Sequence, residues 1–170
     1  RFVALKTLDK KRVDMKIIIF FKYALTILLF FNINFVRADF TAKVQRVVDG
    51  DTIHVEDPTG KKFKVRLTGI DAPEQNQPYG LASTSHLREL LLNKFVLLES
   101  KPKKGKPYSV DRYKRVLAKI VLDGRDINLS QVLSGYAWHF KRYQKQQSPK
   151  DRESYSQAEL HARENELGLW

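Results

Sequence analysis

The sequence contains no cysteine and only one methionine among its 170 residues. Without cysteine, the chain can form no disulfide bond and no metal site that uses thiolates. Its four histidines, His54, His86, His139 and His161, are scattered and show no ligand spacing. No serine lies in a nucleophile-elbow motif, and no glycine-rich loop could hold a nucleoside triphosphate. Zinc enzymes, elbow-type hydrolases and P-loop proteins are therefore poor matches.

Positive charge is in excess: 31 lysine and arginine residues stand against 19 aspartate and glutamate residues, a formal net charge of +12. The first 38 residues hold eight of the basic and two of the acidic side chains, so residues 39–170 still carry +6. A basic body favours a polyanionic partner, either nucleic acid or an anionic membrane surface. The alternative is that excess lysine only keeps a small protein soluble, and charge alone does not decide between them.

The first 38 residues differ in composition from the rest. Residues 1–14 are polar and patternless, and Met15 is the only methionine. We therefore expect translation to start at Met15 and residues 1–14 to be a disordered upstream stretch. Residues 17–36 are nearly all apolar and lead into Val-Arg-Ala, which is typical of a secretory signal at residues 15–38 with cleavage after Ala38. An uncleaved membrane anchor is the alternative, because the run approaches the roughly 20 residues that span a bilayer.

Five short segments in the remaining domain, residues 39–170, have the pattern of strands. In the first, Phe40, Ala42, Val44 and Val48 alternate with Thr41, Lys43, Gln45 and Val47. The second and third, around Ile53 and Val65, form a hairpin, because the Asp-Pro-Thr-Gly sequence at 57–60 is turn chemistry. The fourth and fifth cover residues 95–99 and 115–122.

Helices are predicted in three places. The first covers residues 81–93, the second residues 127–134, and the third runs from the cap Ser148 to residue 167, with Gly168 as its stop. The residues expected on the buried faces are Leu81, Leu87, Leu90 and Leu91 in the first helix and Tyr155, Ala158 and Ala162 in the third. The arrangement indicates an α+β protein that is mainly β, a five-stranded OB-fold barrel with about three helices.

The segment 48–74 places Asp51, Asp71, Glu74 and Arg66 in the two hairpin strands and in the turns that end them. Folding the hairpin can bring Asp51 close to Asp71, and alternation sends Arg66 to the face opposite the core. Paired carboxylates repel each other unless a cation or a proton joins them. With a guanidinium nearby, this pair suits a hard metal ion that holds a phosphate. Capping of turns is the alternative role for either aspartate alone.

Three motifs in register, DGDT at 49–52, VRLTGIDAPE at 65–74 and DRYKRVLA at 111–118, resemble the staphylococcal nuclease (thermonuclease) family. The similarity extends over residues 40–170, through NLSQVLSGYAWHF to the closing GLW. The resemblance implies an OB-fold and a calcium-dependent phosphodiesterase that cuts DNA and RNA. It also implies a Ca²⁺ site formed by Asp51, Asp71 and the main-chain carbonyl of Ala72, where the family often has threonine.

Further roles follow from the same resemblance. Glu74 corresponds to the catalytic glutamate, which orients or deprotonates the attacking water. Arg66 and Arg115 match the two arginines that bind the scissile phosphate. A solvated loop glutamate and surface salt bridges are the alternatives for these positions.

Three more positions match residues that bind the substrate in this family. Arg112 and Tyr113 correspond to residues that bind the neighbouring phosphate, with arginine here in place of lysine. Tyr143 matches one tyrosine of the nucleotide pocket, whereas Lys141 replaces another, so base stacking should differ here. The loop after Glu74 is also shorter than in the namesake enzyme, so substrate access should differ.

The resulting hypothesis is an exported, calcium-dependent, sugar-nonspecific endonuclease that leaves 3′-phosphates on DNA and RNA. We expect it to act as a monomer without a protein partner. The alternative is a noncatalytic OB-fold module that binds nucleic acid or serves as an interaction platform. In a further alternative, residues 17–36 hold the same enzyme at a membrane.

Overall fold

Five strands form a closed barrel in the computed structural model, which describes residues 39–103 and 105–170. They are β1 (Phe40–Val47), β2 (Thr52–Glu56), β3 (Lys62–Leu67), β5 (Phe95–Glu99) and β6 (Val116–Leu122). The strand order is β3-β2-β1-β5-β6, and a parallel pairing of β3 with β6 closes the barrel. The predicted OB-fold with mainly β and some α structure is confirmed. The predicted upstream stretch 1–14 and signal sequence 15–38 lie outside the described residues.

Each barrel strand contributes fully buried side chains to one core, represented by Val44, Ile53, Val65, Leu98 and Ile120. Alternation along the strands explains this pattern, because every second side chain points inward.

The alternation predicted for β1 is wrong at its end, where Val47 is buried and Val48 is only half-buried. An irregularity in the pairing with β2 between Val44 and Arg46 shifts the strand by one residue. A β-bulge of this kind puts the next core residue out of phase with a strict period of two.

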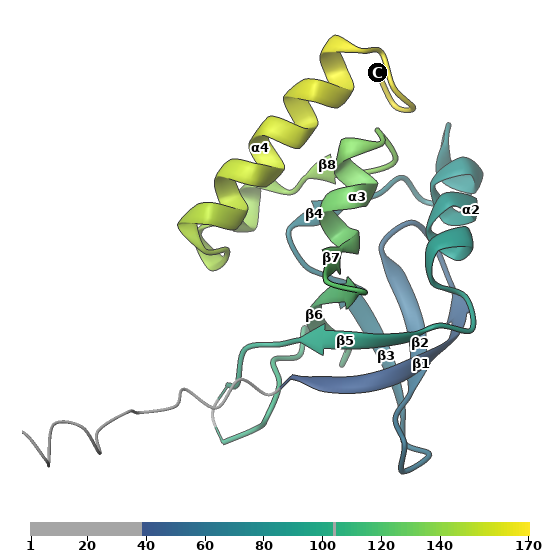
Figure 1. Ribbon diagram of the computed structural model, residues 1–170, viewed down its shortest axis with the longest axis vertical. Coiled ribbons are helices and arrows are strands. Elements are labelled where there is room, and N and C mark those ends of the chain that lie inside the picture. The colour runs from purple at the N-terminus through teal and green to yellow at the C-terminus, as the bar shows by residue number, and fades with distance from the viewer. Residues whose placement is uncertain (1–38, 104) are drawn as a thin grey trace, which may run out of the picture. The chain divides into compact units, whose positions relative to one another are not determined.

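Three helices cover one side of the strands, and α3 lies between α2 and α4 (Figure 1). They are α2 (Gly80–Leu91), α3 (Ile127–Leu133) and α4 (Pro149–Glu164), and a 3₁₀ helix, η1 (Lys141–Gln146), precedes α4. Short strands β4 (Ile70–Asp71) and β8 (Trp138–His139) pair with each other, and β7 (Arg125–Asp126) extends the main sheet beside β6. None of the helices in the described part of the chain is both long and apolar enough to cross a membrane.

The buried face of α2 differs from the predicted one, because Leu81 is 68% exposed. The helix instead buries Gly80, Ser83, Thr84, Leu87 and Leu91. The two hydroxyl residues can be buried because each finds a main-chain acceptor: Ser83 Oγ donates to the carbonyl of Tyr136 and Thr84 Oγ1 to that of Gly80. Hydrophobic periodicity alone does not predict the burial of such hydroxyl residues.

The last helix, α4, begins as predicted, with Ser148 Oγ accepting from the amide of Asp151 at 3.0 Å. Tyr155, Ala158 and Ala162 are buried, as expected from their spacing. The helix ends at Glu164, three residues before the predicted end. Gly168 is therefore not its stop; a Cβ there would lie 2.2 Å from the carbonyl oxygen of Gly135, so this glycine allows two loops to touch.

Candidate active site

The residues predicted to act together lie where β2 begins and where β3 ends. Thr52, directly after Asp51, pairs with Arg66 across the β2–β3 ladder. Two residues beyond β3, the chain turns into β4, which ends at Asp71. The parallel pairing of β3 with β6 places Arg66 beside Leu117, so Arg115 enters the same region just before β6 begins.

Arg66 lies between the two aspartates and contacts both. Its Nη2 is 3.0 Å from Asp51 Oδ2 and 3.0 Å from Asp71 Oδ1, so these oxygens are no farther apart than twice that distance. Its Nη1 donates to the main-chain carbonyls of Leu67 (2.8 Å) and Ile70 (3.0 Å). The side chain therefore leaves the core, as alternation predicted, yet it is only 12% exposed.

A chain of hydrogen bonds joins this trio to the second arginine. Thr52 Oγ1 donates to Asp51 Oδ1 at 3.0 Å, and Arg115 Nη1 reaches Thr52 Oγ1 at 3.3 Å. Asp51 Oδ2 also accepts from the amide of Ala72 at 2.9 Å, which ties the main chain of this predicted metal-binding residue to Asp51. Four of the five side chains predicted to act together, Asp51, Arg66, Asp71 and Arg115, thus meet in one place.

The fifth, Glu74, lies three residues after Asp71 in an exposed loop. Among the residues that the structure describes, its carboxylate makes no hydrogen bond or ion pair. Its main chain is held: the amide donates to Gln77 Oε1 (2.8 Å), and its carbonyl accepts from the Gln77 amide (2.9 Å). A Cβ on Gly80 would lie 1.9 Å from that carbonyl oxygen, so glycine is needed where α2 begins. The loop is therefore positioned while the side chain stays free to turn.

Arg112 and Tyr113 lie in the turn before β6, next to Arg115. Tyr113 is exposed, and the guanidinium carbons of Arg112 and Arg115 lie 4.7 Å and 5.5 Å from the centre of its ring. Tyr143 comes from η1 and packs on Phe140, with ring centres 5.0 Å apart. No contact in the described part of the chain joins Tyr143 to the arginines, so the structure does not bring it into the cluster.

Comparison with known proteins decides the family. The model of the staphylococcal nuclease homologue family matches residues 64–170, more than half of the chain. The chain belongs to the staphylococcal nuclease family. The matched range includes Arg66, Asp71, Glu74 and Arg115, whereas Asp51 lies ahead of it.

Relatives of this nuclease family member carry names that agree with the assignment. A Haemophilus influenzae "uncharacterized endonuclease" is 38% identical over 130 residues, which cover 76% of this chain and 66% of that protein. The "micrococcal nuclease" of Shigella flexneri is 34% identical over 142 residues, or 78% of this chain and 75% of that one. A "staphylococcal-like nuclease" of Arabidopsis thaliana is 33% identical over 115 residues, 68% of this chain but 32% of that protein. Together they support a nuclease function.

The electrostatics of this candidate site centre on Asp51, whose side chain is only 9% exposed. Burial raises the pKa of Asp51 to about 7, and Asp49 acts in the same direction, although Arg66 and the hydrogen bonds from Ala72 and Thr52 oppose the rise. A buried carboxylate of this kind is stabilised in its charged form by a nearby cation.

The donors present fit a hard cation in kind but do not surround one. The described residues contain no group of three or more His, Cys, Asp or Glu side chains that could hold a metal. Two carboxylates and a main-chain carbonyl are oxygen donors, the type that Ca²⁺ prefers, and Ca²⁺ tolerates irregular shells completed by water. A calcium ion here would therefore depend on water and substrate oxygens for the rest of its shell.

Two residues that support the site were not predicted from the sequence. Asp111 accepts from the amides of Tyr113 and Arg115 (both 2.9 Å) and from Arg115 Nε (2.8 Å), and so fixes the second arginine. Burial acts to raise the pKa of Asp111, but the bonds from Arg115 hold it below its usual value. The sequence could have indicated this role, since an aspartate at the start of a turn commonly accepts hydrogen bonds from the amides that follow it.

Gln131 of α3 is the other missed residue, and it is fully buried. Its Nε2 donates to the carbonyl of Gly50 at 2.9 Å, directly before Asp51, and its Oε1 contacts Nδ1 of His86. A Cβ on Gly50 would lie 1.8 Å from Ser83 Oγ, so the turn fits closely against α2. No local pattern predicts a contact between residues so far apart in the sequence.

Proposed function

We propose that this protein is an exported, calcium-dependent endonuclease that hydrolyses the phosphodiester bonds of DNA and RNA to 3′-phosphate products. The observation that carries the proposal is the continuous contact path from Asp71 through Arg66, Asp51 and Thr52 to Arg115. This path brings together paired carboxylates, which can hold a metal ion, and two guanidinium groups, and such charged groups stabilise a transferring phosphoryl group.

Asp51, Asp71 and the carbonyl of Ala72 would hold the metal. A calcium ion bound there would supply positive charge beside the scissile phosphate. Because the two carboxylates now share Arg66 Nη2, a cation that takes over their charge would leave this group free to donate to a phosphate oxygen.

Arg66 and Arg115 would bind the phosphate from two sides. A planar guanidinium can donate two parallel hydrogen bonds to phosphate oxygens, and it stabilises the negative charge that grows as the attacking oxygen arrives. Asp111 would keep Arg115 oriented, since it holds both the main chain and Nε of that arginine. Arg112 and Tyr113 would bind the neighbouring phosphate, and Tyr143 would contact a nucleotide farther out.

Glu74 would act on the nucleophile. Its free carboxylate would accept a proton from water as the water oxygen bonds to phosphorus, and the bond from phosphorus to the 5′ oxygen would break. The departing 5′ oxygen would take up a proton from solvent water, and the phosphate would stay on the 3′ side. The 2′ position of the sugar takes no part in this scheme, which is why both DNA and RNA should serve.

The test uses residues 39–170 with supercoiled plasmid and a labelled RNA, in calcium or in a chelator. Cleavage should require calcium, and the DNA ends should be extended by a polymerase only after phosphatase treatment, because a 3′-phosphate blocks extension. Glu74→Gln should retain the fold and DNA affinity but lose most of the turnover. Plasmid that is shifted but never cut would instead support a binding module, and equal turnover by Glu74→Gln would refute the mechanism.

Export is a separate part of the proposal and rests on the apolar run at residues 17–36. Mass spectrometry of the mature protein should find Asp39 as its first residue. A mature chain that retains residues 17–36 would support attachment to a membrane instead.

A further inference from the structure

Basic side chains continue along the outer face of the barrel, beyond the candidate active site. On β3, alternation places Lys62 and Lys64 on the same face as Arg66. Successive members of this row are about 6.6 Å apart along the strand, two residues at the usual rise. A cationic row therefore leads away from the phosphate-binding arginine.

The row widens across the neighbouring strands. His54 of β2 pairs with Lys64, and Arg46 of β1 pairs with His54, so three nitrogen-bearing side chains lie side by side on one face. They line a groove with a volume of about 400 Å³, together with Lys62 and Glu56. We call this surface, formed by Arg46, His54, Lys62 and Lys64, the basic groove.

The positive charge of the basic groove is largely uncompensated. Arg46 and Lys64 are exposed and make no ion pair within residues 39–103 and 105–170. Lys62 forms a long ion pair with Glu56, at 3.9 Å, but it is 80% exposed, so solvent screens this pair. Burial and then the charges of the neighbouring Lys64 and Arg46 lower the pKa of His54. This field would attract an anionic chain.

We propose that the basic groove binds the phosphates of a single nucleic-acid strand next to the scissile bond, beyond the nucleotides held by Arg66 and Arg115. This inference rests on the proposed function, and it identifies the favoured substrate as a polymer rather than a short oligonucleotide. A positively charged groove that follows the sugar–phosphate backbone is a general solution for binding single strands.

A nucleic-acid strand suits this surface better than an anionic membrane does. Stable membrane contact usually combines basic residues with apolar side chains that insert into the lipid. Among the described residues, none of the exposed large hydrophobic side chains lines the groove, and Phe95 of β5, which is exposed, lies two strands away from Glu56, beside Lys43. The groove also shares β3 with Arg66, so the row of cationic side chains runs from the candidate active site into the groove.

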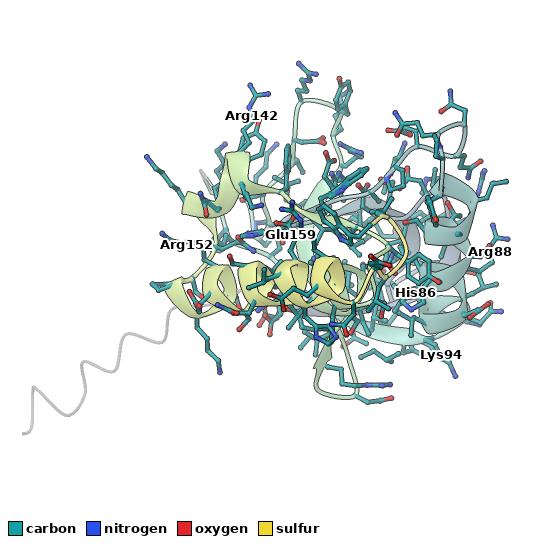
Figure 2. All side chains as sticks on the ribbon, turned by 90° about the horizontal axis from the view of Figure 1, so that it is seen from above. His86, Arg88, Lys94, Arg142, Arg152 and Glu159 are labelled. Carbon is teal, nitrogen blue, oxygen red and sulfur yellow. The ribbon has the colours of Figure 1, made fainter. Side chains whose placement is uncertain are left out.

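The test compares two double variants that each remove one arginine and one lysine. Arg46→Gln/Lys64→Gln alters the basic groove. Arg88→Gln/Lys150→Gln is the matched control on α2 and α4, and Arg88 points outward at the α2 side of the molecule (Figure 2). Fluorescence anisotropy in a chelator measures binding of labelled single strands of about 4 and about 16 nucleotides, over a range of salt, without any cleavage.

For the long strand, Arg46→Gln/Lys64→Gln should reduce the slope of log affinity against log salt by about 1.4, since each lost contact removes ~0.7. Over the decade of salt from 1 M down to about 0.1 M, this difference in slope lowers the affinity of the variant by up to ~25-fold relative to the wild type. Affinity for the short strand, and kcat on it with calcium, should stay at the wild-type level. The control pair should change neither slope nor length dependence.

Equal losses for both lengths, or equal losses in the control pair, would overturn the proposal. So would loss of binding to phosphatidylserine vesicles with unchanged affinity for the long strand, because that result assigns the groove to a membrane. If the wild type never cleaves, but Arg46→Gln/Lys64→Gln still loses affinity for the long strand only, the hydrolytic function is refuted and the proposal for the basic groove is retained. Thermal unfolding of each variant checks that these exposed substitutions leave the fold intact.

Discussion

Replacing Arg66 by glutamine should expose how strongly the two aspartates depend on a cation. The substitution removes the guanidinium that contacts Asp51 and Asp71 at 3.0 Å each. The Asp71 contact contributes little, since that side chain is 49% exposed and screened by solvent. The contact with Asp51 decides how much stability is lost, because the side chains of Arg66 and Asp51 are both nearly buried. Breaking such a pair costs about 3–5 kcal/mol at pH values where Asp51 stays charged. The loss is smaller near neutral pH, because the pKa of Asp51 is already about 7 and the carboxyl can take up a proton once Arg66 is gone.

Calcium should restore much of this loss. A ligand that binds only the folded state stabilises it by about 2.7 kcal/mol when its concentration is 100 times the dissociation constant. Arg66→Gln should respond more strongly than the wild type, because in the wild type the ion must compete with the charge of Arg66. Urea unfolding of both proteins, in calcium and in a chelator, gives the two free-energy differences.

The matched control is the double variant Arg66→Gln/Asp51→Asn. It carries no buried charge, so in a chelator it should be at least as stable as Arg66→Gln, and calcium should hardly change its unfolding midpoint. A calcium response that survives in the double variant would place the ion elsewhere. A response absent from both the wild type and Arg66→Gln would refute the shared cation site.

Other substitutions test the surroundings of this site. Arg115→Gln should lower kcat by about 10²–10³ while DNA affinity in a chelator changes less, as seen by single-turnover kinetics. Asp111→Asn should remove stability that the wild type has above the ordinary aspartate pKa. Because the folded pKa of Asp111 is lowered, the gap between the two urea midpoints should close as the pH falls through that lower value. Gln131→Leu should cost about 1–3 kcal/mol for each buried polar group that loses its partner. It should also weaken the calcium-induced shift in midpoint, because Gln131 holds the carbonyl of Gly50 next to Asp51.

Local rules predicted the parts of this molecule that depend on neighbouring residues. The turn at 57–60 closes as expected, with Asp57 accepting the amide of Gly60 at 2.9 Å and Gly60 at a positive φ of 83°. Alternation on β3 correctly separated Val65 from Arg66. These features need only strand geometry and turn chemistry, which short stretches of sequence specify.

Features that depend on distant contacts could not be predicted in this way. The bond from Arg115 to Thr52 joins residues 63 positions apart, and it exists only because β3 pairs with β6. Gln131 reads as a polar residue in a short helix, yet it is buried between two partners that no periodicity relates to it. The resemblance of motifs suggested that Arg66 and Arg115 share a phosphate, whereas the physical reason for their proximity is the closure of the barrel.

This closure makes the stability of the barrel and the geometry of the site a single property. The register pairs Val65 with Val116 and Arg66 with Leu117. A slip of one residue would move every side chain of β6 to the opposite face, exposing Ala118 and Ile120 and carrying Arg115 away from Thr52. Because the buried residues of β6 resist that slip, the core holds the two arginines in register. An enzyme with charged groups at the ends of strands can therefore leave the Glu74 side chain free to turn while its phosphate-binding groups stay fixed.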